Sequence, residues 1–180
     1  MKAILHGIEI EIIQGNIIAQ DDITAIVNAA NAQLLSGGGV AGAIHRAAGP
    51  GLEKECRPLA PIKPGEAVIT GGHNLSNQYV IHCLGPVYGV NEPAAELLAN
   101  CYRNALNLAE KNEIESIAFP AISTGIFGYP LEEAADVALQ TILAIIPGIK
   151  FIKKIRMVLY GNDNQAIHEK VLSRLVNERV

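Results

Sequence analysis

VNAANAQLLSGGGVAGAIHRAAGP, residues 27–50, is the stretch of this sequence from which the fold can be worked out. It begins at the end of a short apolar run, passes two asparagines, crosses three glycines and enters a run of small residues typical of a helix. A strand, a glycine loop and a helix start form the layout of an anion-binding site, because glycine lets the backbone approach a phosphate and free N–H groups of the helix point toward it. The alternative is a glycine-rich surface loop before an ordinary helix, and the glycines alone do not decide between the two.

The glycines also match a dinucleotide fingerprint, which we reject. Gly37, Gly39 and Gly42 fit the pattern G-x-G-x-x-G. That pattern requires its first glycine directly after a strand and an acidic residue about 20 residues later, at the end of a second strand. Here residues 30–36 separate the strand from the glycines, and the downstream acids lie in GLEKECRPLAP, which does not read as a strand. No G-K-[ST] is present, so the sequence does not predict an ATP-type phosphate loop.

Length and composition narrow the class of protein. A chain of 180 residues, 49% hydrophobic and 18% charged, predicts one core-rich domain over residues 1–180. No apolar run reaches the roughly 18–20 residues of a membrane span, so we expect no membrane association. The cysteines, Cys56, Cys83 and Cys101, are odd in number and scattered, which favours reduced thiols and a cytoplasmic location. A net charge of −4 without a basic block argues against nucleic-acid binding, and the oligomeric state stays open.

Apolar periodicity predicts strands alternating with helices. The predicted strands are residues 8–13, 25–29, 66–70, 79–84, 116–119 and 155–160. The predicted helices are residues 40–48, 92–111, 131–146 and 164–176, the last with Asp163 as its N-cap. We expect residues 51–64, which contain three prolines, to be irregular, and residues 71–74 to form a hairpin or short loop. This order predicts an α/β fold with a mixed, mostly parallel sheet covered on both faces.

In such sheets ligands bind at the carboxyl ends of strands, and one further loop there stands out. Residues 120–130, PAISTGIFGYP, join a predicted strand to a predicted helix and contain two glycines, two hydroxyls and two aromatic side chains. Ser123 and Thr124 can hydrogen-bond phosphate oxygens, and Phe127 can pack on a sugar or a ring. The alternative is a tight strand–helix loop with a core aromatic. Facing the first glycine loop, this segment would clamp a diphosphate.

Taken together, the motifs VNAAN, GGGV-x-GAIHRAAGP, IHCLGPVY and IAFPAISTGIFGYPLEEAA closely resemble those of a macro domain, and the resemblance covers roughly residues 8–175. It implies a three-layer α/β/α sandwich and ADP-ribose, free or attached to a protein, as the ligand. Many members of the family, including the MacroD-type branch that this chain resembles, are hydrolases. They remove ADP-ribose from acidic protein side chains or the acetyl group from O-acetyl-ADP-ribose, whereas other members only bind ADP-ribose. The resemblance implies neither a cofactor nor a metal.

The resemblance also implies roles for particular residues. Asn16 and Ile17 lie where the family contacts adenine, and Tyr160 is a weaker candidate for packing on adenine. Asn31 lies where the family contacts the distal ribose, and Asn28 supports the loop. The residues implied to line the diphosphate are Gly38, Gly39 and Val40 on one side and Ser123, Thr124, Gly125, Ile126 and Phe127 on the other.

Two positions depart from the family pattern. The adenine-reading residue, usually an aspartate in a G-D-I segment, is Asn16. The hydrolase branch usually reads GGGVDGAIH, with the aspartate positioning or activating water, and this chain has Ala41 in its place. The second departure bears on catalysis rather than binding. We therefore expect slow hydrolysis of ADP-ribosyl esters, with two alternatives: a non-catalytic ADP-ribose reader and a phosphatase acting on phosphate esters of ADP-ribose.

Other candidate residues carry weaker signals. For His45, on the helix that follows the glycines, packing or hydrogen bonding is favoured over catalysis. His82 and Cys83 would alternate across a strand, so they cannot share a metal ion. Ser123 does not lie in a G-x-S-x-G elbow, which argues against a serine-hydrolase triad.

Overall fold

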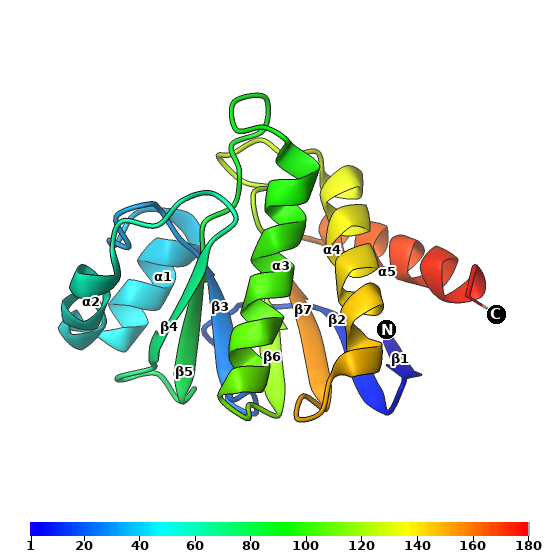
Figure 1. Cartoon of the computed structure of the whole chain (residues 1–180), viewed down its shortest axis with the longest axis horizontal. Coiled ribbons are helices and arrows are strands. Elements are labelled where there is room, and N and C mark those ends of the chain that lie inside the picture. The colour runs from blue at the N-terminus through cyan, green and yellow to red at the C-terminus, as the bar shows by residue number, and fades with distance from the viewer. Residues whose placement is uncertain (180) are drawn as a thin grey trace.

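The computed structural model describes residues 1–179, which are arranged around one seven-stranded sheet (Figure 1). In chain order the strands are β1 (Lys2–Leu5), β2 (Ile8–Gln14), β3 (Ala25–Ala29), β4 (Ala67–Gly71), β5 (Tyr79–Cys83), β6 (Ser116–Phe119) and β7 (Lys154–Leu159). Across the sheet their order is β1-β2-β7-β6-β3-β5-β4. The edge strands β1 and β4 pair antiparallel with their neighbours, and the other pairs are parallel. The predicted mixed, mostly parallel sheet is therefore confirmed.

Helices cover both faces of this sheet. One face is covered by α1 (Gly39–Ala48) and α2 (Pro50–Cys56). The core on the other face contains residues of α3 (Ala94–Lys111), α4 (Leu131–Ile145) and α5 (Asn162–Asn177). Two short 3-10 helices, η1 (Arg57–Leu59) and η2 (Ile146–Gly148), follow α2 and α4. In β3, Ile26 packs in the core beside α1 and Val27 in the core beside α3, because successive strand residues point to opposite faces. The result is the expected three-layer α/β/α sandwich.

Residues 51–64, predicted to be irregular, contain helix α2 and the turn η1, so that prediction was wrong. Pro50 stands at the start of α2, where its missing N–H has no partner to lose and its fixed φ suits the helix. The three prolines that suggested irregular structure, at positions 58, 61 and 64, all come after α2 has ended.

Three smaller differences concern the ends of elements. Asp163 is not the N-cap of α5, because that position is held by Gly161 and Asp163 lies in the first turn. The antiparallel edge strand β1 was not predicted. Strand β7 ends at Leu159, so Tyr160 lies just beyond it rather than at its last position.

Two further features bear on the predictions that the chain has no membrane span and that its cysteines are reduced. None of the helices within residues 1–179 combines the length and the apolar character that a membrane span requires. Cys56, Cys83 and Cys101 are free thiols, and all three are buried.

Candidate functional site

The predicted site residues come from loops at one edge of the sheet. Strands β2, β7, β6 and β3 are neighbours and run parallel, so their carboxyl ends lie at the same edge, the upper one in Figure 1. The segments that follow these strands begin at Gly15, Ala30, Pro120 and Tyr160. This topology brings together segments separated by more than a hundred residues of sequence, at the place where α/β sheets bind ligands.

The glycine loop leads into α1 with its backbone donors free. Gly38 is the N-cap of α1 and no side chain caps the helix. Within residues 1–179, the N–H groups of Gly39, Val40 and Ala41 make no hydrogen bond. A Cβ added at Gly38 or Gly39 would meet no atom within 4 Å, so the loop beside these donors is not packed against other residues. This arrangement offers an anion three N–H groups and the positive end of the helix dipole.

Gly42, one turn into α1, has a different role. A Cβ at this position would lie 2.2 Å from the carbonyl oxygen of Gly37. Only glycine therefore lets the first turn of α1 pack against its own loop. Ala41 beside it is buried, at 5% exposure, and carries no group that could handle a proton.

The two asparagines of the first loop have different surroundings. Asn31 closes the turn that follows β3: its amide nitrogen donates to the Leu35 carbonyl (2.8 Å) and its Oδ1 accepts from the Leu35 N–H (3.0 Å). A carboxamide has two N–H groups and two lone pairs on oxygen, so one donor and one acceptor of Asn31 remain for a ligand. Asn28 is buried, its Nδ2 donating to His82 Nδ1 (3.1 Å), which is the supporting position expected for it.

His82 ties three strands together through hydrogen bonds. Because the Asn28 amide can only donate to Nδ1, the ring proton lies on Nε2, which is 2.9 Å from the Thr70 hydroxyl. Burial, together with the nearby His45, lowers the pKa of His82 to about 3, so the ring is neutral. Cys83 packs in the core on the opposite face of the sheet. No group of three or more His, Cys, Asp or Glu side chains within residues 1–179 could hold a metal ion.

The second loop, residues 120–130, does not present its hydroxyls as the sequence suggested. Ser123 adopts a left-handed backbone conformation (φ +68°), and its buried hydroxyl has no hydrogen-bond partner among the described residues. A Cβ on Gly85 would come within 2.1 Å of that hydroxyl. The Thr124 hydroxyl donates to the Ala121 carbonyl (2.8 Å). The Thr124 hydroxyl therefore serves the loop itself, whereas the Ser123 hydroxyl is buried and unpaired.

What this loop offers instead is a second set of backbone donors. No hydrogen bond within residues 1–179 uses the N–H groups of Ser123, Gly125, Ile126 and Phe127, whereas those of Thr124, Gly128 and Tyr129 are bonded inside the loop. Successive unpaired N–H groups in such a turn form a concavity that suits an anion. Two large apolar side chains at the same edge, Ile126 at 97% and Tyr160 at 92%, are almost fully exposed.

The loop after β2 carries the two residues expected beside adenine. Asn16 Oδ1 accepts from the Ile18 N–H (3.2 Å), and Gln20 Nε2 donates to the Asn16 carbonyl (2.9 Å). The Ile17 side chain is buried in the core beside α1, which leaves its backbone as the part that can reach a ligand.

An ion cluster centred on the buried side chains of Arg156 and Glu11 fixes this loop to the sheet. Arg156 on β7 contacts Glu11 on β2 (2.5 Å), Asp22 (2.8 Å) and Gln20 (2.9 Å). Burial acts to raise the pKa of Glu11, but hydrogen bonds, chiefly from Arg156, lower it to about 2. The same guanidinium lowers the pKa of Asp22 to about 2. The cluster therefore ties Gln20 and Asp22, in the loop after β2, to charged side chains of the sheet.

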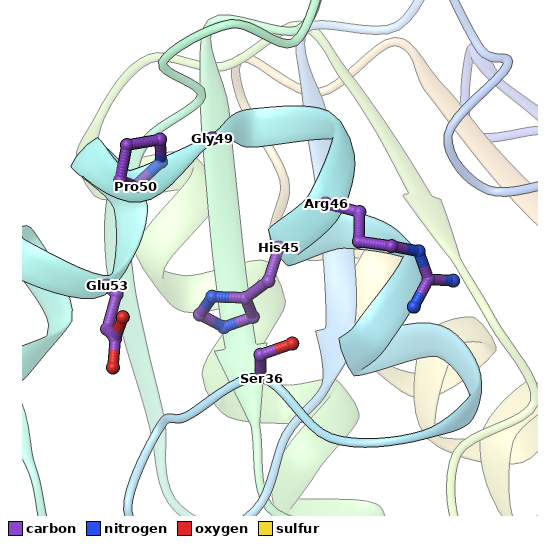
Figure 2. Close-up of a pocket in the computed structure, with 6 residues that line it drawn as sticks. All are labelled: Ser36, His45, Arg46, Gly49, Pro50 and Glu53. Atoms are coloured by element: carbon purple, nitrogen blue, oxygen red, sulfur yellow. The ribbon is translucent and has the colours of Figure 1, made fainter.

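A cavity of about 280 Å³ lies beside the glycine loop and between α1 and α2 (Figure 2). Figure 2 shows the His45 ring projecting from α1 toward Ser36 and Glu53. The His45 side chain is 7% exposed, and its Nε2 has no hydrogen-bond partner among the described residues. Burial lowers the pKa of His45, so the free nitrogen belongs to a neutral ring. Sequence periodicity placed His45 on the helix but gave no sign of this cavity.

Comparison with known proteins agrees with this geometry. The model of the family described as Macro domain matches residues 27–138. An O-acetyl-ADP-ribose deacetylase of Salmonella typhimurium is 45% identical over 170 residues, which are 92% of this chain and 94% of the relative. The chain belongs to the macro domain family.

Solved macro domain structures show the same fold. The Oceanobacillus iheyensis macrodomain with ADP superposes with a TM-score of 0.95 at 40% identity, over 99% of this chain and 97% of that one. The Trypanosoma brucei macrodomain in complex with ADP-ribose has a TM-score of 0.82 at 38% identity, over 89% of this chain and 68% of that one. The expected family and the expected fold class are both confirmed.

Proposed function

We propose that this macro domain binds ADP-ribose at the edge formed by the carboxyl ends of β2, β7, β6 and β3. The observation that carries the proposal is the pair of unpaired N–H sets, one at the start of α1 and one in residues 123–127. Together they offer a diphosphate neutral, directed donors, which fits a chain with a net charge of −4 and no basic block. The related macrodomains solved with ADP and with ADP-ribose support this choice of ligand.

Each predicted residue then has a role that the geometry permits. The diphosphate is bound by Gly38, Gly39 and Val40 on one side and by the free N–H groups of Ser123, Gly125, Ile126 and Phe127 on the other, while Thr124 lines the same loop with its own donors bonded to Ala121. Adenine lies near Asn16 and the Ile17 backbone, with the exposed Tyr160 ring available to pack on it. The remaining donor and acceptor of Asn31 reach the distal ribose, and Asn28 supports the strand beneath.

We further propose that the protein hydrolyses ADP-ribosyl esters slowly, releasing ADP-ribose and a carboxylate. Ala41 cannot act as a general base, a contribution that is typically worth about 10²–10⁴-fold. The diphosphate of the substrate would lie beside the ester, and one of its oxygens can orient a water molecule while Asn31 positions the sugar. The deacetylase relative supports an ester as the bond that is cleaved.

The second candidate is a protein that binds ADP-ribose without turnover, and the alanine at position 41 favours it. A phosphatase acting on phosphate esters of ADP-ribose has no comparable observation in its favour. A slow ester hydrolase and a protein that only binds ADP-ribose differ in one measurable quantity. Only the hydrolase cleaves the ADP-ribosyl ester faster than the uncatalysed rate.

Incubation with a glutamate-ADP-ribosylated protein separates the two candidates. The wild-type protein should release ADP-ribose slowly but measurably. Ala41→Asp should raise the rate at least about tenfold, because it supplies a general base at a helix N-terminus that stabilises a carboxylate. ADP-ribose affinity should stay within a few-fold, whereas Asn31→Ala should lower both rate and affinity.

Two outcomes of this experiment would change the assignment. A wild-type rate equal to uncatalysed ester loss would make the protein a reader. A fast wild-type enzyme that Ala41→Asp leaves unchanged would mean that another group, with His45 the first to test, activates the water.

A further inference from the structure

A second cavity lies next to the residue 120–130 loop, on the side that faces α3 and α4. It has a volume of about 440 Å³ and is lined by Tyr88, Glu92, Pro93, Tyr129 and Glu133, among others. The segment before α3, the loop before α4 and the first turn of α4 supply these side chains, and they lie at the upper edge of the molecule in Figure 1. None of the residues assigned to ADP-ribose lines it.

Two tyrosine rings form one wall of this cavity. The ring centroids of Tyr88 and Tyr129 are 4.8 Å apart with an angle of 55° between the planes. The Tyr88 ring is 43% exposed, whereas Tyr129 is 4% exposed. Although Tyr129 is almost completely buried, its hydroxyl makes no hydrogen bond within residues 1–179. An aromatic pair with an open face and an unused hydroxyl is suited to binding a flat polar group.

Two carboxylates complete the cavity, and no cation of the described chain neutralises them. Glu133 accepts from the Tyr88 hydroxyl (3.4 Å), and Glu92 accepts from the Ala94 N–H (3.1 Å). Neither forms a salt bridge with a lysine or arginine among residues 1–179, in contrast to Glu132, which pairs with Lys170 (3.4 Å). The starts of α3 and α4 supply only about half a positive charge each, so two carboxylates leave the cavity with a net charge of about −1.

The titration of the tyrosines agrees with this negative potential. The nearby Glu133 raises the pKa of Tyr88. Burial raises the pKa of Tyr129, and the charges of Glu133 and Glu92 act in the same direction. Both hydroxyls therefore lie within the field of the carboxylates, where a cation would be stabilised.

The cavity is joined directly to the proposed ADP-ribose site through the backbone. The Tyr88 N–H donates to the Phe127 carbonyl (2.8 Å), and the Tyr129 N–H donates to the Ser123 carbonyl (2.9 Å). The loop expected to face the diphosphate is thus hydrogen-bonded to two residues that line the cavity, Tyr88 and Tyr129. Because Phe127 and Ser123 belong to the loop expected to hold the diphosphate, a protein attached to the bound ADP-ribose is held close to this cavity, and an extended chain advances only about 3.3 Å per residue.

We propose that this cavity binds the guanidinium of an arginine that lies close to the modified residue in the ADP-ribosylated protein. A guanidinium stacks on tyrosine rings and donates to carboxylates in its own plane, a combination that lysine satisfies less well. The proposal rests on the proposed function, because it identifies the class of protein presented to the same site. It makes the site selective for ADP-ribose on basic segments.

The test compares two peptides that carry ADP-ribose through a non-hydrolysable linkage, identical except for arginine or glutamine near the modified residue. Calorimetric titration of the wild-type protein should give about five- to tenfold tighter binding for the arginine peptide at low salt. The preference should shrink as ionic strength rises, because a half-exposed ion pair is screened. Replacing arginine by lysine should retain only part of it.

Matched variants identify the cavity as the cause. Glu92→Gln combined with Glu133→Gln should remove the preference, as should Tyr88→Ala, while Tyr88→Phe, which keeps the ring, should retain most of it. Glu132→Gln is the control, because this neighbour already pairs with Lys170 and should leave the preference intact. Free ADP-ribose should bind all these variants within about twofold of wild type, which also shows that they are folded.

The outcomes separate this inference from the function on which it rests. Equal affinity for the arginine and glutamine peptides, with free ADP-ribose still bound, would overturn the cavity proposal alone. A preference that survives in the double glutamine variant would overturn it as well. Failure of free ADP-ribose to bind the wild-type protein would overturn the proposed function.

Discussion

At the scale of single residues, the site depends on backbone groups more than on side chains. The buried hydroxyl of Ser123 and the bonded hydroxyl of Thr124 leave the N–H groups of their loop as its donors. Three of the six buried polar side-chain atoms without a partner among the described residues belong to Asn28, His45 and Ser123, all on or beside these loops. Unsatisfied buried groups need a reason in a folded protein, and a ligand site is one of the few available.

Asn16 provides a prediction at this scale. Its Oδ1 already accepts from the Ile18 N–H, and an aspartate at this position would keep that turn. A hydrogen bond to a charged acceptor contributes roughly 1.5–3 kcal/mol, against about 0.5–1.5 for a neutral one. Asn16→Asp should therefore tighten ADP-ribose binding by about 1 kcal/mol or less and increase the preference for adenine over hypoxanthine. Calorimetry with ADP-ribose and its hypoxanthine analogue measures both, and weaker binding by the variant would mean that Asn16 donates or that adenine lies elsewhere.

At the scale of elements, the start of α1 depends on one glycine. Gly42→Ala would bring a Cβ within 2.2 Å of the Gly37 carbonyl, so the loop and the helix would have to separate. We expect the free energy of unfolding to fall by about 1–3 kcal/mol, as overpacking typically costs, with ADP-ribose affinity falling too. Gly38→Ala is the control, since its Cβ meets nothing within 4 Å and its φ of −87° suits alanine. Urea denaturation of both variants is the measurement, and equal stability would contradict this account of Gly42.

The elements also show what the sequence could and could not predict. Largely apolar runs such as residues 25–29 predicted the buried strands correctly, because parallel strands covered on both faces are mostly apolar. Helix α2 was not predicted, because the three prolines within residues 58–64 follow it closely and suggested a segment without regular secondary structure.

At the site, motif spacing identified both loops but not the contacts inside them. The direction of the Ser123 hydroxyl depends on a positive φ and on the closeness of Gly85, two features of the folded chain. The cavity between Tyr88 and Glu133 could not be predicted, because it forms only when the segments before α3 and α4 meet at one edge.

At the scale of the whole molecule, the order of the strands places segments that are distant in sequence side by side at one edge of the sheet. Arg156 is a clear example, because it joins β7 to Glu11 on β2 and to Asp22 in the loop after β2. The loop expected to hold adenine is thus braced by side chains more than a hundred residues away in the sequence. The cluster therefore contributes to stability and fixes the position of this loop at the same time.

That link predicts how stability depends on pH. Both carboxylates have pKa values of about 2 in the folded protein, below their ordinary values of 4.5 for Glu11 and 3.8 for Asp22. Their contribution is therefore fully present above about pH 5 and is lost progressively as the pH falls toward 2, with Glu11 accounting for about 2–3 kcal/mol. Urea denaturation between pH 7 and pH 3 should show this loss, and Glu11→Gln should show a shallower slope. An unchanged slope in that variant would mean that other carboxylates cause the acid sensitivity.

The central claim, that the two sets of N–H groups clamp the diphosphate of ADP-ribose, is tested most directly by calorimetric titration of the wild-type protein with ADP-ribose and with AMP. ADP-ribose should bind one to one and at least about tenfold more tightly, because AMP leaves the second phosphate and the distal-ribose contacts of Asn31 unmade. Equal affinity for the two ligands, or no binding of ADP-ribose, would contradict the account.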